Sequence, residues 1–153
     1  LADVIEGALS AAMQQLGPEC ATLRSEVPSD FPRMNLDPAM MRRALVNLLV
    51  NGSQAAGSAG SVVIRSSVES RSGGPIARIE VSDDGPGIAP AIAERVFEPF
   101  FTTKATGTGL GLAIVKSIVE AHGGHIELGP NGERGTRATL LLPLEMDAEM
   151  AAG

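Results

Sequence analysis

Two glycine-rich segments carry the residue types best suited to chemistry in this chain. The first reads Asp83-Asp84-Gly85-Pro86-Gly87-Ile88, and the second, Gly107-Thr108-Gly109-Leu110-Gly111, runs directly into a helical pattern. Backbone N–H groups at a glycine-rich helix start form a site for phosphate. An acid in the first segment has the wrong charge for phosphate, but it suits an amino group. Together the two segments predict a purine nucleotide held at both ends.

Asp83 is the sharpest single candidate. It continues the apolar face of a strand predicted over residues 76–82, where an ionised carboxylate is costly unless it has a partner. The exocyclic amino group of adenine would be such a partner, and Gly85 and Gly87 would let a flat base approach the backbone. Thr136 lies on the inner face of the last predicted strand, so its hydroxyl could reach Asp83 or the base. An Asp-Gly turn that simply ends a strand is the structural alternative.

Three amide side chains share one face of a helix predicted over residues 37–56. They are Asn47, Asn51 and Gln54, and their spacings of four and three residues place them side by side. Amide oxygens can ligate Mg²⁺, which keeps water and substrate phosphates as its other ligands. A polar helix flank that bonds other side chains is the alternative here.

Residues 88–106 have little periodicity and predict a long loop with a short helix near residues 89–96. Loops of this length inside a domain are usually functional. Three of the four phenylalanines lie here, at Phe97, Phe100 and Phe101. They either anchor the loop to the core or cover the site when the loop closes, and anchoring is favoured. Lys104 could add a phosphate contact.

The remaining patterns supply the elements that must position these residues. Apolar periodicity predicts helices at 3–16, 37–56 and 109–122, and strands at 20–27, 61–69, 76–82, 125–128 and 137–144, with a further short strand at 34–36. Three long helices with about five strands, some joined as hairpins, predict an α/β (α+β) two-layer sandwich. Its sheet is mixed and its helices lie on one face.

Size and charge narrow the class of protein. A chain of 153 residues fits one domain. A net charge of −6 argues against a nucleic-acid partner or direct membrane contact. The single cysteine, Cys20, excludes an internal disulfide and fits a reducing, cytoplasmic location. No apolar run approaches the roughly 20 residues of a membrane span.

Taken together, these segments resemble the catalytic and ATP-binding domain of bacterial sensor histidine kinases. That domain belongs to a superfamily that includes gyrase, Hsp90 and MutL. Five motifs occur in the family's order: an N box at residues 47–51, a first glycine box at 83–87, an F box at 97–100, a second glycine box at 107–111 and a third at 135–136. The resemblance covers residues 1–145, leaving 146–153 as a tail, and it implies the Bergerat ATP-binding fold. The Phe-Phe-Thr-Thr-Lys sequence also resembles nitrogen-regulation-type kinases.

The resemblance implies roles for individual residues. Asn51 would hold Mg²⁺ against the phosphates of ATP with Asn47 beside it, and Asp83 would bond the adenine amino group. Residues 109–111 would cradle phosphates, and residues 88–108 would form an ATP lid. The full set of ATP-binding residues implied in this way is Asn47, Asn51, Asp83, Gly85, Gly87, Ile88, Lys104, Thr108, Gly109, Leu110, Gly111 and Thr136.

The chain departs from the family pattern in two places. Gln54 stands where many members have a basic residue, so phosphate neutralisation would rest more on Mg²⁺ and Lys104. We also find no His-Glu-x-x-Pro-like phosphoacceptor helix. The implied partner is therefore the phosphoacceptor and dimerisation domain of the same kinase, which would precede Leu1, and indirectly a response regulator. The isolated domain is expected to be monomeric, and whether the full protein is tethered to a membrane stays open.

Three other functions remain to be weighed. A nucleotide-binding regulatory module without phosphotransfer activity is compatible with the sequence. An ATP-hydrolysing switch of the gyrase or MutL kind would need a general base at the position of Asn47, and an amide cannot accept a proton from water. A serine/threonine anti-sigma kinase of the same superfamily fits less well because of the F box.

Overall fold

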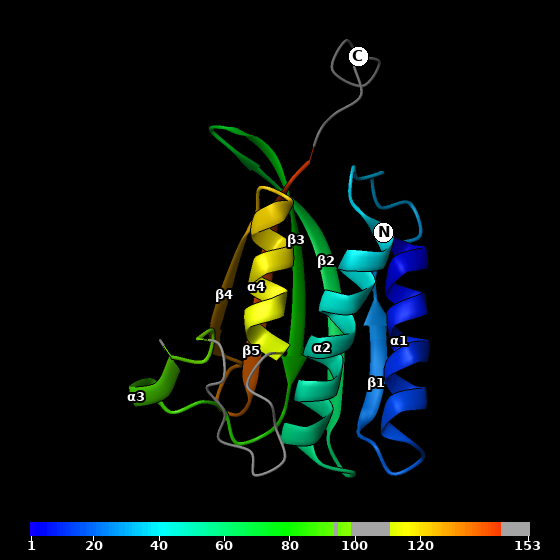
Figure 1. The fold of residues 1–153 in the computed structure, drawn as a ribbon, viewed down its shortest axis with the longest axis vertical. Helices are drawn as coiled ribbons and strands as arrows, with labels where there is room; N and C mark the ends of the chain where they lie inside the picture. The colour runs from blue at the N-terminus through cyan, green and yellow to red at the C-terminus, as the bar shows by residue number, and fades with distance from the viewer. Residues whose placement is uncertain (94, 99–110, 145–153) are drawn as a thin grey trace.

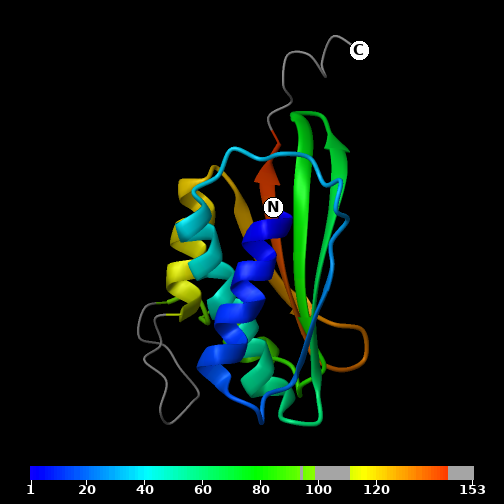
Figure 2. The same cartoon turned by 90° about the vertical axis from the view of Figure 1, so that its right-hand side faces the viewer.

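Within residues 1–93, 95–98 and 111–144, which the computed structural model describes, five strands form one mixed sheet with the long helices on a single face (Figures 1 and 2). The elements in chain order are α1 (Ala2–Leu16), β1 (Thr22–Glu26), α2 (Pro38–Ala56), β2 (Ser61–Arg71), β3 (Gly74–Asp83), α3 (Pro90–Ala93), α4 (Gly111–Ala121), β4 (His125–Pro130) and β5 (Thr136–Pro143). The predicted two-layer α/β sandwich is confirmed.

The sheet has the order β1-β2-β3-β5-β4. Only β1 and β2 run parallel, and the other neighbouring pairs are antiparallel. This order places the end of β3 beside the beginning of β5, with Ser82 opposite Arg137 as the pair nearest that end of the sheet. The first glycine-rich segment and the turn after β4 therefore meet at one end of the sheet.

The core is aliphatic, as a chain without Trp or Tyr requires. Alternate residues of the central strands point toward α1, α2 and α4, and burying each valine, leucine or isoleucine among them contributes roughly 1.5–3 kcal/mol. The buried inner-face residues of these strands are Val62, Ile64, Ala77, Ile79, Val81, Ala138, Leu140 and Leu142. On β3, this buried inner face ends at Asp83.

The start of α2 is capped by the side chain that precedes it. The Asp37 carboxylate accepts hydrogen bonds from the N–H groups of Ala39 and Met40 at 3.0 and 3.1 Å, and Pro38 occupies the first turn. His122, at the end of α4, also reaches this cap, because its Nε2 accepts from the Asp37 N–H at 3.0 Å. Its Nδ1 lies 2.8 Å from the Ile118 carbonyl oxygen, so the imidazole also caps the end of α4.

Some predicted boundaries were wrong. Residues 34–36 form no strand, and the hairpin of β2 and β3 extends almost to its tip, so the predicted loop at 70–75 shrinks to a turn at Ser72 and Gly73. The short helix predicted near 89–96 exists as α3. Phe97 packs, partly buried, against the core, in line with an anchoring role. Phe100 and Phe101 lie outside the described residues.

Candidate functional site

Asp83 is the last residue of β3 and is only 7% exposed. Its Oδ1 accepts two backbone hydrogen bonds, from Gly85 N–H at 2.9 Å and from Thr136 N–H at 3.3 Å. Burial raises the pKa of this carboxyl group, and the two N–H donors work against that rise. Oδ2 accepts no hydrogen bond from the residues that the structure describes, so a donor from outside the protein can occupy it.

Thr136 begins β5 beside Asp83, as the strand pattern predicted. The contact with Asp83 is made by its backbone N–H, whereas the sequence pointed to its hydroxyl. The hydroxyl therefore plays no part in holding the carboxylate, and the strand backbone does that instead.

Two glycines permit the close packing around this carboxylate. A β-carbon at Gly85 would lie 2.7 Å from the carbonyl oxygen of Ala55 in α2. A β-carbon at Gly135, whose φ is +103°, would collide with the carbonyl oxygen of Asp83. The structure thus shows Gly85 in close contact with α2, whereas the sequence predicted that it would let a flat base approach the backbone. Gly135 of the third glycine box makes a comparable close contact that spacing alone did not reveal.

Asp84 contrasts with its neighbour. It is exposed, and its carboxylate accepts hydrogen bonds from the Ser61 N–H at 3.0 Å and the Ser61 hydroxyl at 3.2 Å. These hydrogen bonds lower the pKa of Asp84. The pKa values of these two adjacent acids are therefore shifted in opposite directions. Of the two, only Asp83 is buried, as expected of a ligand-binding group.

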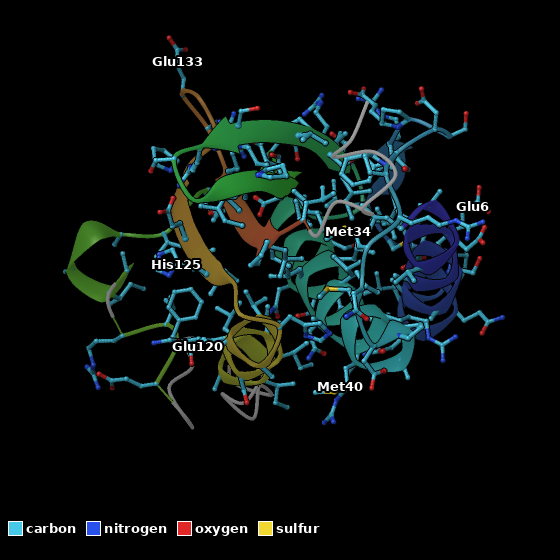
Figure 3. All side chains as sticks on the ribbon, turned by 90° about the horizontal axis from the view of Figure 1, so that it is seen from above. Glu6, Met34, Met40, Glu120, His125 and Glu133 are labelled. Carbon is cyan, nitrogen blue, oxygen red and sulfur yellow. The ribbon has the colours of Figure 1, made fainter. Side chains whose placement is uncertain are left out.

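A cavity of about 390 Å³ lies next to the segment that follows β3. Asp83 itself is not part of its lining, but Thr136, whose N–H bonds the Asp83 carboxylate, is. The cavity volume is in the range of small-molecule sites. Its lining comes from the segment after β3, from Ala93 of α3 and from both sides of the turn between β4 and β5: Pro86, Gly87, Ile88, Ala93, Leu128, Gly129, Pro130, Gly132, Glu133, Gly135 and Thr136. Three predicted site residues, Gly87, Ile88 and Thr136, thus share one cavity. Glu133, at the tip of the turn, projects away from the sheet (Figure 3).

The predicted amide group lies on α2, next to the start of α4. Asn47 and Asn51 are half-buried and Gln54 is exposed. The Asn51 Nδ2 lies 3.6 Å from the place that a β-carbon on Gly111 would take, so the N box meets the beginning of α4. The described residues contain no group of three or more His, Cys, Asp or Glu that could hold a metal ion by themselves. An amide oxygen with phosphates and waters fits Mg²⁺ without such a group.

Four predicted site residues, Lys104, Thr108, Gly109 and Leu110, lie outside the described residues, as does most of the predicted lid. Of the second glycine box, only Gly111 is described, at the first position of α4. Sequence patterns did not point to Leu128, Asn131 or Arg134. They placed the segment around Asn131 only in a turn, and the one signal in its favour was the nearness of that turn to Gly135 and Thr136.

No helix in the described part of the chain is both long and apolar enough to cross a membrane.

Comparison with known proteins places these features in a family context. A family model described as histidine kinase-, DNA gyrase B-, and HSP90-like ATPase matches residues 36–146. The sensor histidine kinase ZraS of Escherichia coli O157:H7 is 43% identical over 124 residues, which is 81% of this chain and 26% of ZraS. The C4-dicarboxylate transport sensor protein DctS of Rhodobacter capsulatus is 34% identical over 151 residues, 99% of this chain and 23% of DctS. The chain thus spans about a quarter of the length of these relatives.

Solved structures give the same picture. The catalytic domain of histidine kinase ThkA, in a nucleotide-free form, superposes with a TM-score of 0.80 at 30% identity, covering 94% of this chain and 92% of that one. The mycobacterial sensor histidine kinase MprB has a TM-score of 0.80 at 28% identity, with 95% of both chains covered.

Proposed function

Because this chain belongs to the histidine kinase-, DNA gyrase B-, and HSP90-like ATPase family, we propose that it is the ATP-binding catalytic domain of a two-component sensor histidine kinase. In this role it donates the γ-phosphoryl group of ATP to a histidine on a separate phosphoacceptor domain. The observation that carries the proposal is the buried Asp83 carboxylate, with Oδ1 occupied by backbone donors and Oδ2 left for a ligand.

The adenine end of ATP fits the cavity beside Asp83. The 6-amino group donates to Asp83 Oδ2, and the base lies against Gly87 and Ile88, which line the cavity with Thr136. An unpaired carboxylate in this position is costly. Partnering Oδ2 with an amino group removes that cost, whereas the 6-oxo group of a hypoxanthine or guanine base presents only lone pairs to it.

The phosphate end of ATP fits the junction of α2 and α4. Asn51 offers an amide oxygen to Mg²⁺, Asn47 lies one turn before it, and Gly111 begins α4 beside it. When bound, Mg²⁺ neutralises phosphate charge and orients the γ-phosphoryl group. Lys104, Thr108, Gly109 and Leu110 complete the proposed phosphate-binding set.

The proposed reaction moves one phosphoryl group. An imidazole nitrogen of the phosphoacceptor histidine bonds to the γ-phosphorus while the bond from that phosphorus to the β,γ-bridging oxygen breaks, and ADP leaves. Catalysis rests on positioning and charge neutralisation. The phosphoacceptor and dimerisation domain of the same kinase supplies the histidine and passes the group to a response regulator. Use of ATP and a single cysteine support a cytoplasmic site of action.

Calorimetric titration with ATP and ADP, with and without Mg²⁺, tests the binding step. Asp83→Asn should weaken ATP binding at least tenfold, about 1.4 kcal/mol. It should also improve binding of inosine triphosphate, because the new amide can donate to a 6-oxo group. Arg65→Ala, on the opposite face of the sheet, is the matched control and should leave both affinities unchanged.

The transfer step needs a supplied phosphoacceptor domain and γ-labelled ATP. Label on its histidine would support the kinase. Nucleotide binding without transfer to any such domain would favour the regulatory module instead. A folded chain that binds no nucleotide would overturn both.

A further inference from the structure

The turn between β4 and β5, residues 131–135, holds the backbone at the end of β3 with two side chains. Asn131 Nδ2 donates to the carbonyl oxygen of Asp83 at 2.9 Å. Arg134 Nε donates to the carbonyl oxygen of Asp84 at 2.9 Å. The pairing of β3 with β5 stops at Ser82, so side chains of the turn continue the connection where the strand ladder ends. We call this group of contacts the turn clasp.

The amide of Asn131 is oriented by partners of opposite kinds. Its nitrogen faces a carbonyl oxygen, which can only accept, and its Oδ1 lies 3.2 Å from Arg137 Nη2, which can only donate. A flipped amide would set oxygen against oxygen and nitrogen against nitrogen. The backbone N–H of Asn131 also donates to the Gly135 carbonyl oxygen at 3.1 Å, which closes the turn on itself.

Arg137 reaches the clasp from the far face of the sheet. Thr136 shares the inner face with Asp83, so the next residue, Arg137, points to the face without helices. There it lies opposite Ser82, and both the Arg137 Nε and the Ser82 hydroxyl are buried without a hydrogen-bond partner. The guanidinium is therefore held in place mainly by packing and by its bond to Asn131, a costly arrangement that needs a reason.

We propose that Asn131 is a positioning residue for the Asp83 carboxylate and that Arg137 orients it from the opposite face of the sheet. This inference rests on the proposed adenine site. Asn131 fixes the Asp83 carbonyl, and Gly135 packs against the same oxygen. The peptide plane that follows Asp83 is thereby locked, and with it the direction in which Oδ2 is presented. The clasp sets adenine preference rather than phosphate affinity.

The test compares ATP with inosine triphosphate, since the two differ at the base atom that Asp83 recognises. In Asn131→Ala and Asn131→Asp, the donor to the Asp83 carbonyl is lost, and ATP affinity should fall about fivefold, the worth of one hydrogen bond. Affinity for inosine triphosphate should change by less than about twofold, because that base does not use the carboxylate. A general loss of structure would weaken the binding of both nucleotides by the same factor.

The role of Arg137 is tested by asking whether the effect of its substitution depends on the presence of Asn131. Arg137→Ala should lower ATP affinity by a smaller factor, about threefold, because it loosens only the orientation of the amide. In an Asn131→Ala background the same change should have no further effect, as expected of residues that act in series. Arg65→Ala is the control for loss of an outer-face arginine. Denaturation midpoints establish that each variant is folded, and if Asn131→Ala fails to fold, Asn131→Asp and Arg137→Ala carry the same test.

Two results separate the outcomes. If the wild type does not bind ATP, or if Asp83→Asn binds ATP as tightly as the wild type does, the proposed adenine site is wrong. If the wild type and Asp83→Asn behave as expected while the Asn131 variants keep the wild-type ratio of ATP to inosine triphosphate affinity, the positioning role is overturned.

Discussion

The two faces of the sheet differ in what they contact and in how they hold their charges. The inner face packs against α1, α2 and α4 with aliphatic side chains, and its single acid on β3, Asp83, has a raised pKa because it is buried. The outer face carries no helix among the described residues, and its acids are paired. Neighbouring residues at the end of one strand, Asp83 and Asp84, therefore face opposite physical conditions.

Charge pairs organise the outer face. Arg65 Nε lies 2.6 Å from Glu26 Oε2 on β1, and Arg78 reaches Glu80 at 2.7 Å and Glu69 at 3.1 Å. The bond to Glu80 is the main reason that the pKa of Arg78 is raised. These pairs lie near water and contribute little each. Most of the stability therefore resides on the inner face, and each ion pair of the outer face contributes little.

Leu140 and Leu141 give the largest expected contrast. They are adjacent on β5, with exposures of 0% and 7%, but only Leu140 belongs to the helix-covered core. Leu140→Ala should lower the free energy of unfolding by about 3–4 kcal/mol, because it leaves a cavity among rigid neighbours. Leu141→Ala should cost about 1–2 kcal/mol, since flexible polar side chains can close over the gap. Urea unfolding of both variants measures the difference. Equal losses of unfolding free energy would show that the two faces contribute equally to stability.

Asp83→Asn tests the buried acid on the inner face of β3. The folded-state pKa of Asp83 lies above its unfolded value, so the folded chain binds the proton more tightly. Its contribution to stability is therefore greatest below the unfolded pKa, near pH 4, and is lost as pH rises through the folded pKa. Without nucleotide, Asp83→Asn should then raise the free energy of unfolding at pH 7 by on the order of 1 kcal/mol.

The same variant carries its own control. Near pH 4 the gain from Asp83→Asn should shrink, because the wild-type carboxyl is then largely protonated. Urea unfolding at the two pH values gives the comparison. A variant that is less stable than the wild type at pH 7 would show that the carboxylate is well satisfied in the empty site, contrary to the inner-face description.

Arg65→Ala gives the smallest expected effect. Its partner Glu26 is about half exposed, so loss of this pair should change the free energy of unfolding by at most ~0.5 kcal/mol, and less in high salt. Thermal unfolding at low and high ionic strength measures it. A loss above about 2 kcal/mol would mean that the outer face carries stability after all.

Local rules were sufficient to predict most of the fold. Asp37 and Pro38 fix the start of α2, and the period-two pattern of β3 places Asp83 on the inner face. The hairpin was predicted too short, because the sequence from Ser70 to Pro75 reads as a turn while ladder bonds with the opposite strand extend both strands. Residues 34–36 lack such a partner, so their strand-like composition produced no strand.

Candidate site residues could be predicted where they belong to a local sequence motif. Contacts between segments that are distant in the sequence could not be predicted. Strand alternation predicted that Asp83 and Thr136 lie close together, and they do. The hydrogen bond from Asn131 joins positions 48 residues apart, and no local spacing encodes it. The same holds for the contact of Gly85 with α2. The sequence pointed to the Thr136 hydroxyl, whereas the contact with Asp83 is made by the Thr136 N–H.

Gly85 and Gly135 also constrain how this protein can change over generations. At both positions any side chain would run into backbone, of α2 in one case and of Asp83 in the other, and backbone cannot yield without moving the carboxylate. Substitutions at these two glycines are therefore rarely tolerated. New base preferences are reached more readily through cavity residues such as Ile88 and Leu128, whose side chains can change in shape while the peptide frame behind them stays in place.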